Sequence, residues 1–290
     1  MSSGLEAPAR VRAYSLLQSG LLQVTVVVLA AILIAVCLFG PFFAPYDPGQ
    51  LATGPRFGPP SFAHPMGTDN LGRDVFSRFL SGARISIGIG LIAAIMSTVL
   101  GLIVGATAGY CEGWVDEVLM RITEMFMVVP RFFLALLMAA LFGASALNII
   151  LAIALLTWPV TARLARAEFM GLRHRQFVQR ARMAGSSHLH IVVREILPNC
   201  LGVIIVSGTL LCAEAMLLEA GLSYFGLGDP GSGSWGLMLY EAQSYLRNAW
   251  WLSAFPGFGI FLAVMTFNVL GDSLNDFYNP RSGDTSRVRN

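Results

Sequence analysis

The sequence predicts an all-α integral membrane protein with six transmembrane helices. Of its 290 residues, 55% are hydrophobic and only 12% are charged, whereas soluble globular domains carry about a quarter charged residues. The apolar residues gather in runs of about 20, the length that an α-helix needs to cross a bilayer at about 1.5 Å per residue. The segments between these runs are polar and rich in Arg, Gly and Pro, as expected for loops outside the membrane.

The start of the chain is predicted to form a polar tail over residues 1–20 and a first transmembrane helix over 21–43, which has no charged residue. This apolar run is longer than the core of a signal peptide and no cleavage site follows it, so we expect the helix to be retained. The next segment, 44–84, is rich in Pro and Gly and is expected to be extracytoplasmic. Within it, Asp69 is predicted to cap a short helix from Asn70 to Leu80.

Five further transmembrane helices are expected in the core of the chain, residues 85–272, before a polar tail over 273–290. A long polar loop, 163–198, and a Gly-rich loop, 221–248, separate some of the apolar runs. The predicted helices cover residues 85–109, 115–142, 146–161, 201–219 and 250–270.

Two of these helices carry patterns that predict how they pack. The second contains Gly101, Gly105 and Gly109 at four-residue spacing, a stripe of small residues that lets another helix approach closely. We expect this stripe to serve packing within the chain. In the third helix, Arg121 and Glu124 are three residues apart and are expected to pair with each other or with neighbours in a structural role.

The basic residues predict the orientation of the helices. All nineteen are Arg, and seven of them lie in the loop 163–198. The two tails hold five more, and six crossings place both tails on the same side as this loop. Because cytosolic loops carry an excess of Lys and Arg, this loop and both termini are predicted to be cytosolic.

Composition also excludes several kinds of chemistry. Without Lys, the chain can contain neither a phosphate-binding P-loop nor the lysine that forms a Schiff base in some enzymes. Any ATP that drives it is therefore expected to bind another chain. The four cysteines show no metal-ligand spacing. His188 and His190 are two apart and point to different faces of a helix, so no metal site is predicted. No zinc protease motif or nucleophile elbow indicates an enzyme.

Residues 177–198 are predicted to form two short amphipathic helices joined by a tight turn. Gly185 can adopt the left-handed conformation that ends a helix, and Ser186 or Ser187 can cap the next one. Pro198 is expected to break the second helix before the fifth transmembrane helix begins. The predicted apolar faces are Phe177, Val178, Ala181 and Ala184 in the first helix and Leu189, Val192, Val193 and Ile196 in the second.

Two interpretations of this pair of helices follow from its residues. It either lies among lipid headgroups, with Arg side chains contacting phosphates, or docks on a cytosolic partner. Because it is joined to transmembrane helices on both sides, a partner that moved it would also move those helices.

Several stretches resemble the permease subunits of ABC importers of the oligopeptide, dipeptide and nickel family. "QRARMAGSSHLHIVVREILPN", residues 179–199, is similar to the loop E-A-A-x3-G-x9-I-x-L-P of these subunits. Ala181, Gly185, Leu197 and Pro198 match it, whereas Gln179, Arg180 and Glu195 depart from it. Similar stretches in the family's order are FAPYDP (43–48), MGTDNLGRDVFSRFLSGARISI (66–87), LEAGLSYFGLG (218–228), WG (235–236) and FNVLGDSLNDFYNP (267–280).

The resemblance implies a type I ABC importer permease fold in a bacterial cytoplasmic (inner) membrane. The implied partners are membrane lipids, a second similar permease subunit, two cytosolic ATPase subunits and an extracytoplasmic substrate-binding protein, with no nucleic acid. ATP and Mg²⁺ then bind the ATPase subunits, and this chain holds no cofactor and is not an enzyme. Small peptides are the implied cargo, with nickel or a metal chelate as the alternative. A self-contained secondary carrier is less favoured, because the chain shows no internal repeat.

The resemblance also assigns roles to particular residues. Residues expected to couple the chain to the ATPase are Phe177, Val178, Gln179, Ala181, Gly185, Ser186, Leu189, Leu197 and Pro198. Residues expected to support the family's structure are Gly67, Thr68, Asp69, Gly72, Arg73, Asp74, Trp235, Gly236, Asn268, Gly271 and Asp272.

Two carboxylates in the fifth helix, Glu214 and Glu219, are candidates for the translocation path or its gate, because a charge within the membrane is costly and usually functional. Five positions separate them, so they lie on different faces of the helix. The alternative for Glu219 is a structural hydrogen bond to the amides of the Gly-rich turn at Gly221, Gly226 and Gly228.

Overall fold

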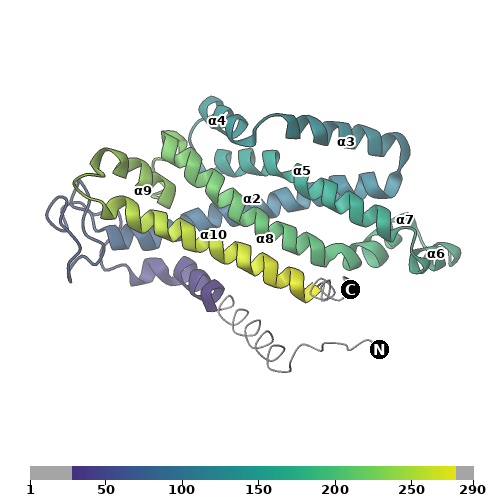
Figure 1. Ribbon diagram of the computed structural model, residues 1–290, viewed down its shortest axis with the longest axis horizontal. Helices are drawn as coiled ribbons and strands as arrows, with labels where there is room; N and C mark the ends of the chain where they lie inside the picture. The colour runs from purple at the N-terminus through teal and green to yellow at the C-terminus, as the bar shows by residue number, and fades with distance from the viewer. Residues whose placement is uncertain (1–27, 279–290) are drawn as a thin grey trace, which may run out of the picture.

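The computed structural model describes residues 28–278, which form a bundle of long helices (Figure 1). No β-strand occurs within these residues, so the predicted all-α class is confirmed. The chain begins there with an apolar helix, Val28–Phe43. The helices that follow are α2 (Val75–Cys111), α3 (Gly113–Val128), α4 (Arg131–Phe142), α5 (Ala146–Leu172), α6 (Gln176–Met183), α7 (His188–His190), α8 (Leu197–Leu222), α9 (Trp235–Ala242) and α10 (Trp251–Tyr278).

Four helices are long and apolar enough to cross a membrane: α2, α5, α10 and the continuous helix His188–Leu227, which contains α8. The pair of α3 and α4, bent by 84°, counts as a fifth crossing if it forms one span. The helix Val28–Phe43 is apolar but shorter, and its predicted start at residue 21 lies outside the described residues. The predicted tail 1–20 and residues 279–290 lie outside them as well. Together these helices are consistent with six crossings.

Several helices extend beyond the apolar runs that predicted them. α2 begins at Val75 rather than at residue 85, because the side chain of Asp74 accepts a hydrogen bond from the amide of Ser77 and caps the helix there. α5 continues to Leu172 and α10 to Tyr278. An apolar run marks the part of a helix that lies in hydrocarbon, whereas the polar turns at its ends remain helical.

The third crossing is not one helix, contrary to the prediction for residues 115–142. α3 ends at Val128, and Val129 has an extended backbone with φ −89° and ψ 134° before Pro130. The residue before a proline is disfavoured in the helical region, because the proline ring crowds its backbone. The chain therefore turns by 84° before α4 begins.

The long helices α2 and α5 pack along the glycine stripe. A Cβ atom on Gly101 would lie 2.6 Å from the Trp158 carbonyl oxygen, and one on Gly109 would lie 2.6 Å from that of Arg166. A Cβ on Gly105 would lie closer still to the Ala162 carbonyl oxygen. The expectation that this stripe packs within the chain is confirmed.

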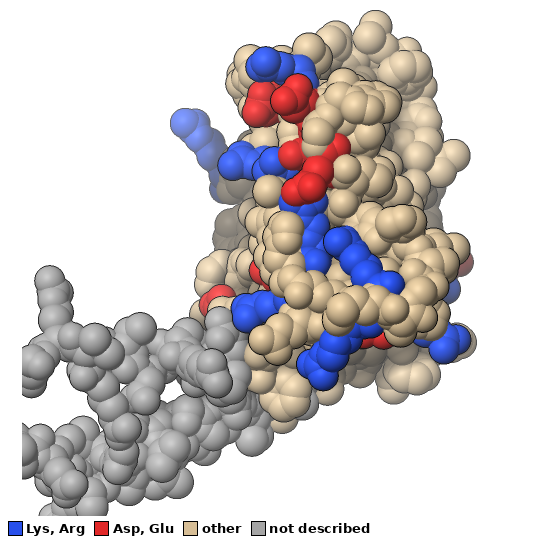
Figure 2. All heavy atoms as spheres, turned by 90° about the vertical axis from the view of Figure 1, so that its right-hand side faces the viewer, with Lys and Arg blue, Asp and Glu red and all other residues tan. Residues whose placement is uncertain are grey.

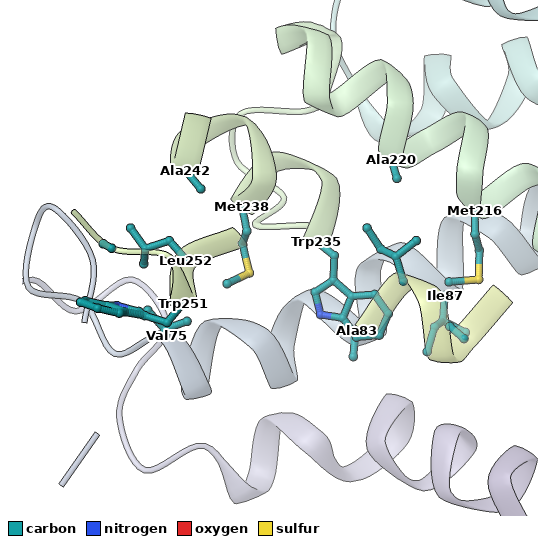
Figure 3. Packing of buried hydrophobic residues seen from close by; sticks show 13 residues of the cluster. Val75, Ala83, Ile87, Met216, Ala220, Trp235, Met238, Ala242, Trp251 and Leu252 are labelled. Carbon is teal, nitrogen blue, oxygen red and sulfur yellow. The ribbon is translucent and has the colours of Figure 1, made fainter. Parts of the chain in front are cut away.

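The far end of the bundle from α6 carries α9, inside the predicted Gly-rich loop (Figure 1). Trp235 and Trp251 lie there in a core cluster with side chains from α2, α8 and α9, as Figure 3 shows. We call this end the α9 end, and the opposite end the hairpin end.

Candidate functional site

The hairpin comprises α6, the turn around Gly185 and the helix from His188 to Ile196, and it closes the end of the bundle opposite α9 (Figure 1). Gly185 has φ +77°, the left-handed conformation predicted for it. The side chain of Ser187, rather than that of Ser186, accepts a hydrogen bond from the His190 amide and caps the second helix. Local rules for helix ends therefore determine this turn.

The second helix of the hairpin continues into α8 without a break, so the prediction that Pro198 interrupts it is wrong. Residues Ile191–Ile196 form a π-helical turn, in which the amide of Leu197 donates to the carbonyl of Val192. Pro198 falls in the first turn of α8, a position where the missing N–H of proline is tolerated. The hairpin is thus rigidly continuous with a transmembrane helix.

The inner face of the hairpin packs against the bundle. Val178 is fully buried in a cluster with Phe169, Ile191 and Ile196, and Phe177, Ala181 and Leu197 pack beside it. The predicted inner face of the second helix was wrong at Leu189 and Val193, which are exposed. The i→i+5 hydrogen bonding of a π-turn aligns Ile191 with Ile196 instead of following the α-helical pattern.

The outer face of the hairpin presents apolar side chains among cations. Met183 and Leu189, on either side of the Gly185 turn, are 81% and 73% exposed. Gln179 and Pro198 are also exposed, whereas Ser186 is half-buried. Figure 2 looks onto this end of the molecule, where Arg side chains gather. The exposed ones on the hairpin and its flanks are Arg175, Arg180, Arg182 and Arg194.

Contacts that the sequence did not predict attach the hairpin and the residues just before it to the end of α2. The buried guanidinium of Arg173 donates to the Gly109 carbonyl at 3.1 Å and pairs with Glu112. The Tyr110 hydroxyl lies 2.7 Å from Nδ1 of His188, and Arg182 lies 5.9 Å from the centre of the Tyr110 ring. Burial, and then the charge of Arg182, lowers the pKa of Arg173. The group stays cationic because a guanidinium titrates far above neutral pH.

The two carboxylates of α8 have different surroundings. Glu214 is half-exposed and forms an ion pair with Arg131, the first residue of α4. Glu219 is only 1% exposed, and its Oε1 accepts hydrogen bonds from Ser223 and Ser234 at 2.8 Å each. Its partners are hydroxyl groups and not the glycine amides proposed from the sequence. Glu219 is therefore buried within the helix bundle, and its hydrogen bonds link the end of α8 to the start of α9.

Comparison with known families identifies the chain. Residues 97–283 match the family described as binding-protein-dependent transport system inner membrane component, a stretch that includes the whole hairpin, α8 and α10. The chain belongs to this family. Its members are components of transport systems, so the prediction that the chain is a permease and not an enzyme is confirmed.

Curated relatives resemble the permease over most of its length. It is 38% identical over 263 residues to a Brucella suis protein assigned as a peptide transport system permease, covering 90% of this chain and 86% of that one. It is 36% identical over 269 residues to an Escherichia coli protein assigned as the D,D-dipeptide transport system permease DdpC, covering 92% and 90% of the two chains.

In the permease, the signature stretch 67–74 builds the loop at the α9 end. Asp69 accepts hydrogen bonds from the amides of Leu71 and Arg73 and from the guanidinium groups of Arg73 and Arg78. Both arginines also reach Glu241, in the last turn of α9, at 3.0 and 2.8 Å. Asp69 therefore organises this cluster, and the prediction that it caps a helix from Asn70 was wrong.

Neighbouring signature residues fix the backbone of the same loop. Gly67 and Gly72 have φ +77° and +71°, a region that residues with a Cβ rarely adopt. The carbonyl of the buried Thr68 accepts a hydrogen bond from the Trp251 ring at 3.2 Å. Asp74 binds Nδ1 of His64 at 2.8 Å as well as capping α2.

The remaining signature residues lie in α9 and α10. Trp235 donates from its ring to the Phe79 carbonyl and from its amide to Ser86. A Cβ on Gly236 would lie 2.8 Å from the Cα of Ala220, so glycine lets α9 approach α8. Asn268, Gly271 and Asp272 lie inside α10, because this helix continues to Tyr278, beyond its predicted end at residue 270. Asn268 donates to the Val264 carbonyl, and Gly271 is buried against Leu210.

Proposed function

We propose that the permease is the membrane subunit of an ATP-driven importer of short peptides. In this proposal two ATPase subunits, which bind ATP and Mg²⁺, dock at the hairpin end. A second permease subunit completes the membrane part, and a substrate-binding protein delivers cargo at the α9 end. The observation that carries the proposal is the hairpin itself, which is joined to α2, α5 and α8 and yet exposes an apolar tip.

The exposed tip favours docking on a protein over insertion among lipid headgroups. An amphipathic helix that lies in a membrane surface buries its apolar face in lipid. In α6 that face, centred on Val178, already packs on the permease's own helices. Met183 and Leu189 project on the other side, as an apolar patch surrounded by polar groups, which is typical of an interaction surface.

The attachments of the hairpin support its role in transmitting motion. When the ATPase subunits close around ATP, they carry the docked hairpins with them. The helix from His188 to Leu227 is continuous, and Tyr110 of α2 contacts His188 in the hairpin. Arg173, between α5 and the hairpin, is held to the end of α2 through the Gly109 carbonyl. A displacement at the tip therefore reaches three transmembrane helices. ATP binding can shift the permease between inward-open and outward-open states only if the hairpin makes different contacts with the open and the closed ATPase subunits.

The orientation that we propose places the hairpin end, and both termini, in the cytosol. The exposed arginines at the hairpin end support it, because basic residues are retained on the cytosolic side of a membrane. The α9 end then faces the binding protein.

Peptide cargo rests on the relatives, whose names refer to peptide and dipeptide transport. These names favour peptides over the nickel alternative, and membership of a binding-protein-dependent family favours a subunit over a self-contained carrier. The test compares cells with and without the gene for uptake of labelled dipeptides, labelled oligopeptides and chelated nickel. Mild-detergent purification of the tagged permease then asks whether ATPase subunits accompany it. Loss of nickel uptake alone, or a purified permease without ATPase subunits, would contradict the proposal.

A further inference from the structure

A charged groove runs between α3 and α5. A cavity of about 450 Å³ is lined by Met120, Thr123, Glu124, Arg163, Arg166 and Ala167. A second hollow of about 660 Å³ shares Met120, Glu124 and Arg166 and continues along α3 to Asp116. Volumes of this size are typical of sites for small molecules.

The charges of this groove lie well inside their helices. Arg163 precedes the end of α5 by nine residues, and Glu124 follows the start of α3 by eleven. At about 1.5 Å per residue, both lie roughly 15 Å from the hairpin ends of these helices. Arg163 closely follows the apolar run 146–161 of α5, so the groove lies at the hairpin-side edge of the hydrocarbon, where a charge that faces lipid is still costly. The groove is therefore expected to face water or a protein partner.

The groove has binding capacity for both signs of charge. Arg166 is occupied, because it holds Asp116 through two bonds of 2.5 and 2.6 Å. Arg163 has no carboxylate partner among the described residues, and its guanidinium donates a hydrogen bond to the sulfur of Met127, at 3.7 Å. Glu124 is held loosely by Arg121 at 3.6 Å, with side chains 64% and 76% exposed. Such an exposed pair contributes little energy, so a ligand can replace Arg121.

We propose that this groove is a binding station for short zwitterionic peptides on the translocation path, an inference that rests on the proposed function. Arg163 binds the peptide's carboxylate, which matches the planar fork of a guanidinium. Glu124 binds its ammonium group. Met120 provides a flexible apolar wall that accommodates different side chains. The station therefore recognises the two termini of the peptide and accepts peptides with different side chains.

The test uses the complete importer in proteoliposomes with its binding protein saturated by each peptide. Uptake rates are measured for one dipeptide with free termini, its C-terminal amide and its N-acetyl form. For Arg163→Gln we expect about a tenfold lower rate with the free dipeptide and an unchanged rate with the amide, because only the free carboxylate uses the charge. Arg163→Lys should recover part of this loss. Glu124→Gln should lower uptake of the free dipeptide but not that of the N-acetyl form.

Each variant is assessed by the ratio of its uptake rates for two peptides. Because the binding protein is the same for every variant, its own preference among the peptides cancels when these ratios are compared. Arg84→Gln is the matched control, since Arg84 is an exposed arginine of α2 without an ion pair among the described residues. Equal free-to-amide ratios in wild type and Arg163→Gln would overturn the station while leaving peptide import intact. A loss that depends on anionic lipid content and not on the peptide would overturn it in favour of a lipid site. If wild type imports no peptide, both the proposed function and the station fail.

Discussion

The hydroxyl of Tyr110 lies 2.7 Å from Nδ1 of His188. This contact joins the last turn of α2 to the first turn of the second hairpin helix, 78 positions later in the chain. The two rings also meet edge to face, with their centres 5.8 Å apart. The end of α2 is thereby a direct support of the hairpin, in addition to the covalent links through α5 and α8.

Replacing Tyr110 with Phe should weaken coupling and leave membrane insertion intact. The change keeps the ring but removes one hydrogen bond, which typically contributes about 0.5–1.5 kcal/mol. We expect the number of peptides imported per ATP hydrolysed in proteoliposomes to fall about two- to tenfold. The double variant with His188→Ala should lose no more than the larger single effect, because both changes remove the same contact. Strictly additive losses would contradict this link.

Substitutions of Gly185 test the backbone conformation of the hairpin turn and not steric crowding. A Cβ at this position would meet no atom within 4 Å, so a bulky residue such as Trp has space, but φ is +77°. Gly185→Ala should therefore cost about 1–2 kcal/mol in the turn, whereas Asn adopts the left-handed region more easily. We expect uptake to fall for Gly185→Ala and to be largely retained for Gly185→Asn. Equal uptake by the two variants would show that turn geometry does not limit coupling.

Glu219 should stabilise the α9 end as a hydrogen-bond acceptor. Glu219→Ala leaves the buried hydroxyls of Ser223 and Ser234 without their partner, at a cost of about 1–3 kcal/mol for each unsatisfied group. Glu219→Gln retains an oxygen that can accept both bonds. In thermal unfolding of the full chain in mild detergent, Glu219→Ala should melt well below wild type and Glu219→Gln close to it. If Glu219→Gln lowered the melting temperature as much as Glu219→Ala, a negative charge would be required at this position.

Local rules explain the features that the sequence predicted correctly. The left-handed glycine at 185, the cap at Ser187 and the small-residue stripe at Gly101, Gly105 and Gly109 each depend on residues within one or two turns. The apolar runs located the transmembrane helices for the same reason. They did not locate the helix ends, because a capped polar turn such as that at Asp74 extends a helix beyond the hydrocarbon.

The predictions that failed, and the contacts that the sequence did not predict, depend on residues distant in the chain or on unusual backbone. Glu219 meets Ser234 across 15 positions, and Arg173 meets Gly109 across 64; no local pattern pairs them. The π-turn at Ile191–Ile196 rotates the faces of the second hairpin helix, so an α-helical period misplaced Leu189 and Val193. Pro130 is visible in the sequence, but the apolar residues on both sides of it suggested one continuous transmembrane helix.

The close packing of α2 on α5 gives a stability prediction with an internal control. Gly105→Ala would drive a methyl group into the Ala162 carbonyl, whereas a Cβ on Gly88, in the same helix, would meet nothing within 4 Å. Overpacking a helix interface costs about 1–3 kcal/mol, while alanine in an open helical position favours the helix by up to about 1 kcal/mol. In mild detergent, Gly105→Ala should therefore lower the melting temperature and Gly88→Ala should leave it unchanged or raise it. Because α5 leads directly into the hairpin, Gly105→Ala should also reduce uptake. Equal melting temperatures for the two variants would show that the α2–α5 contact adapts to an added methyl group.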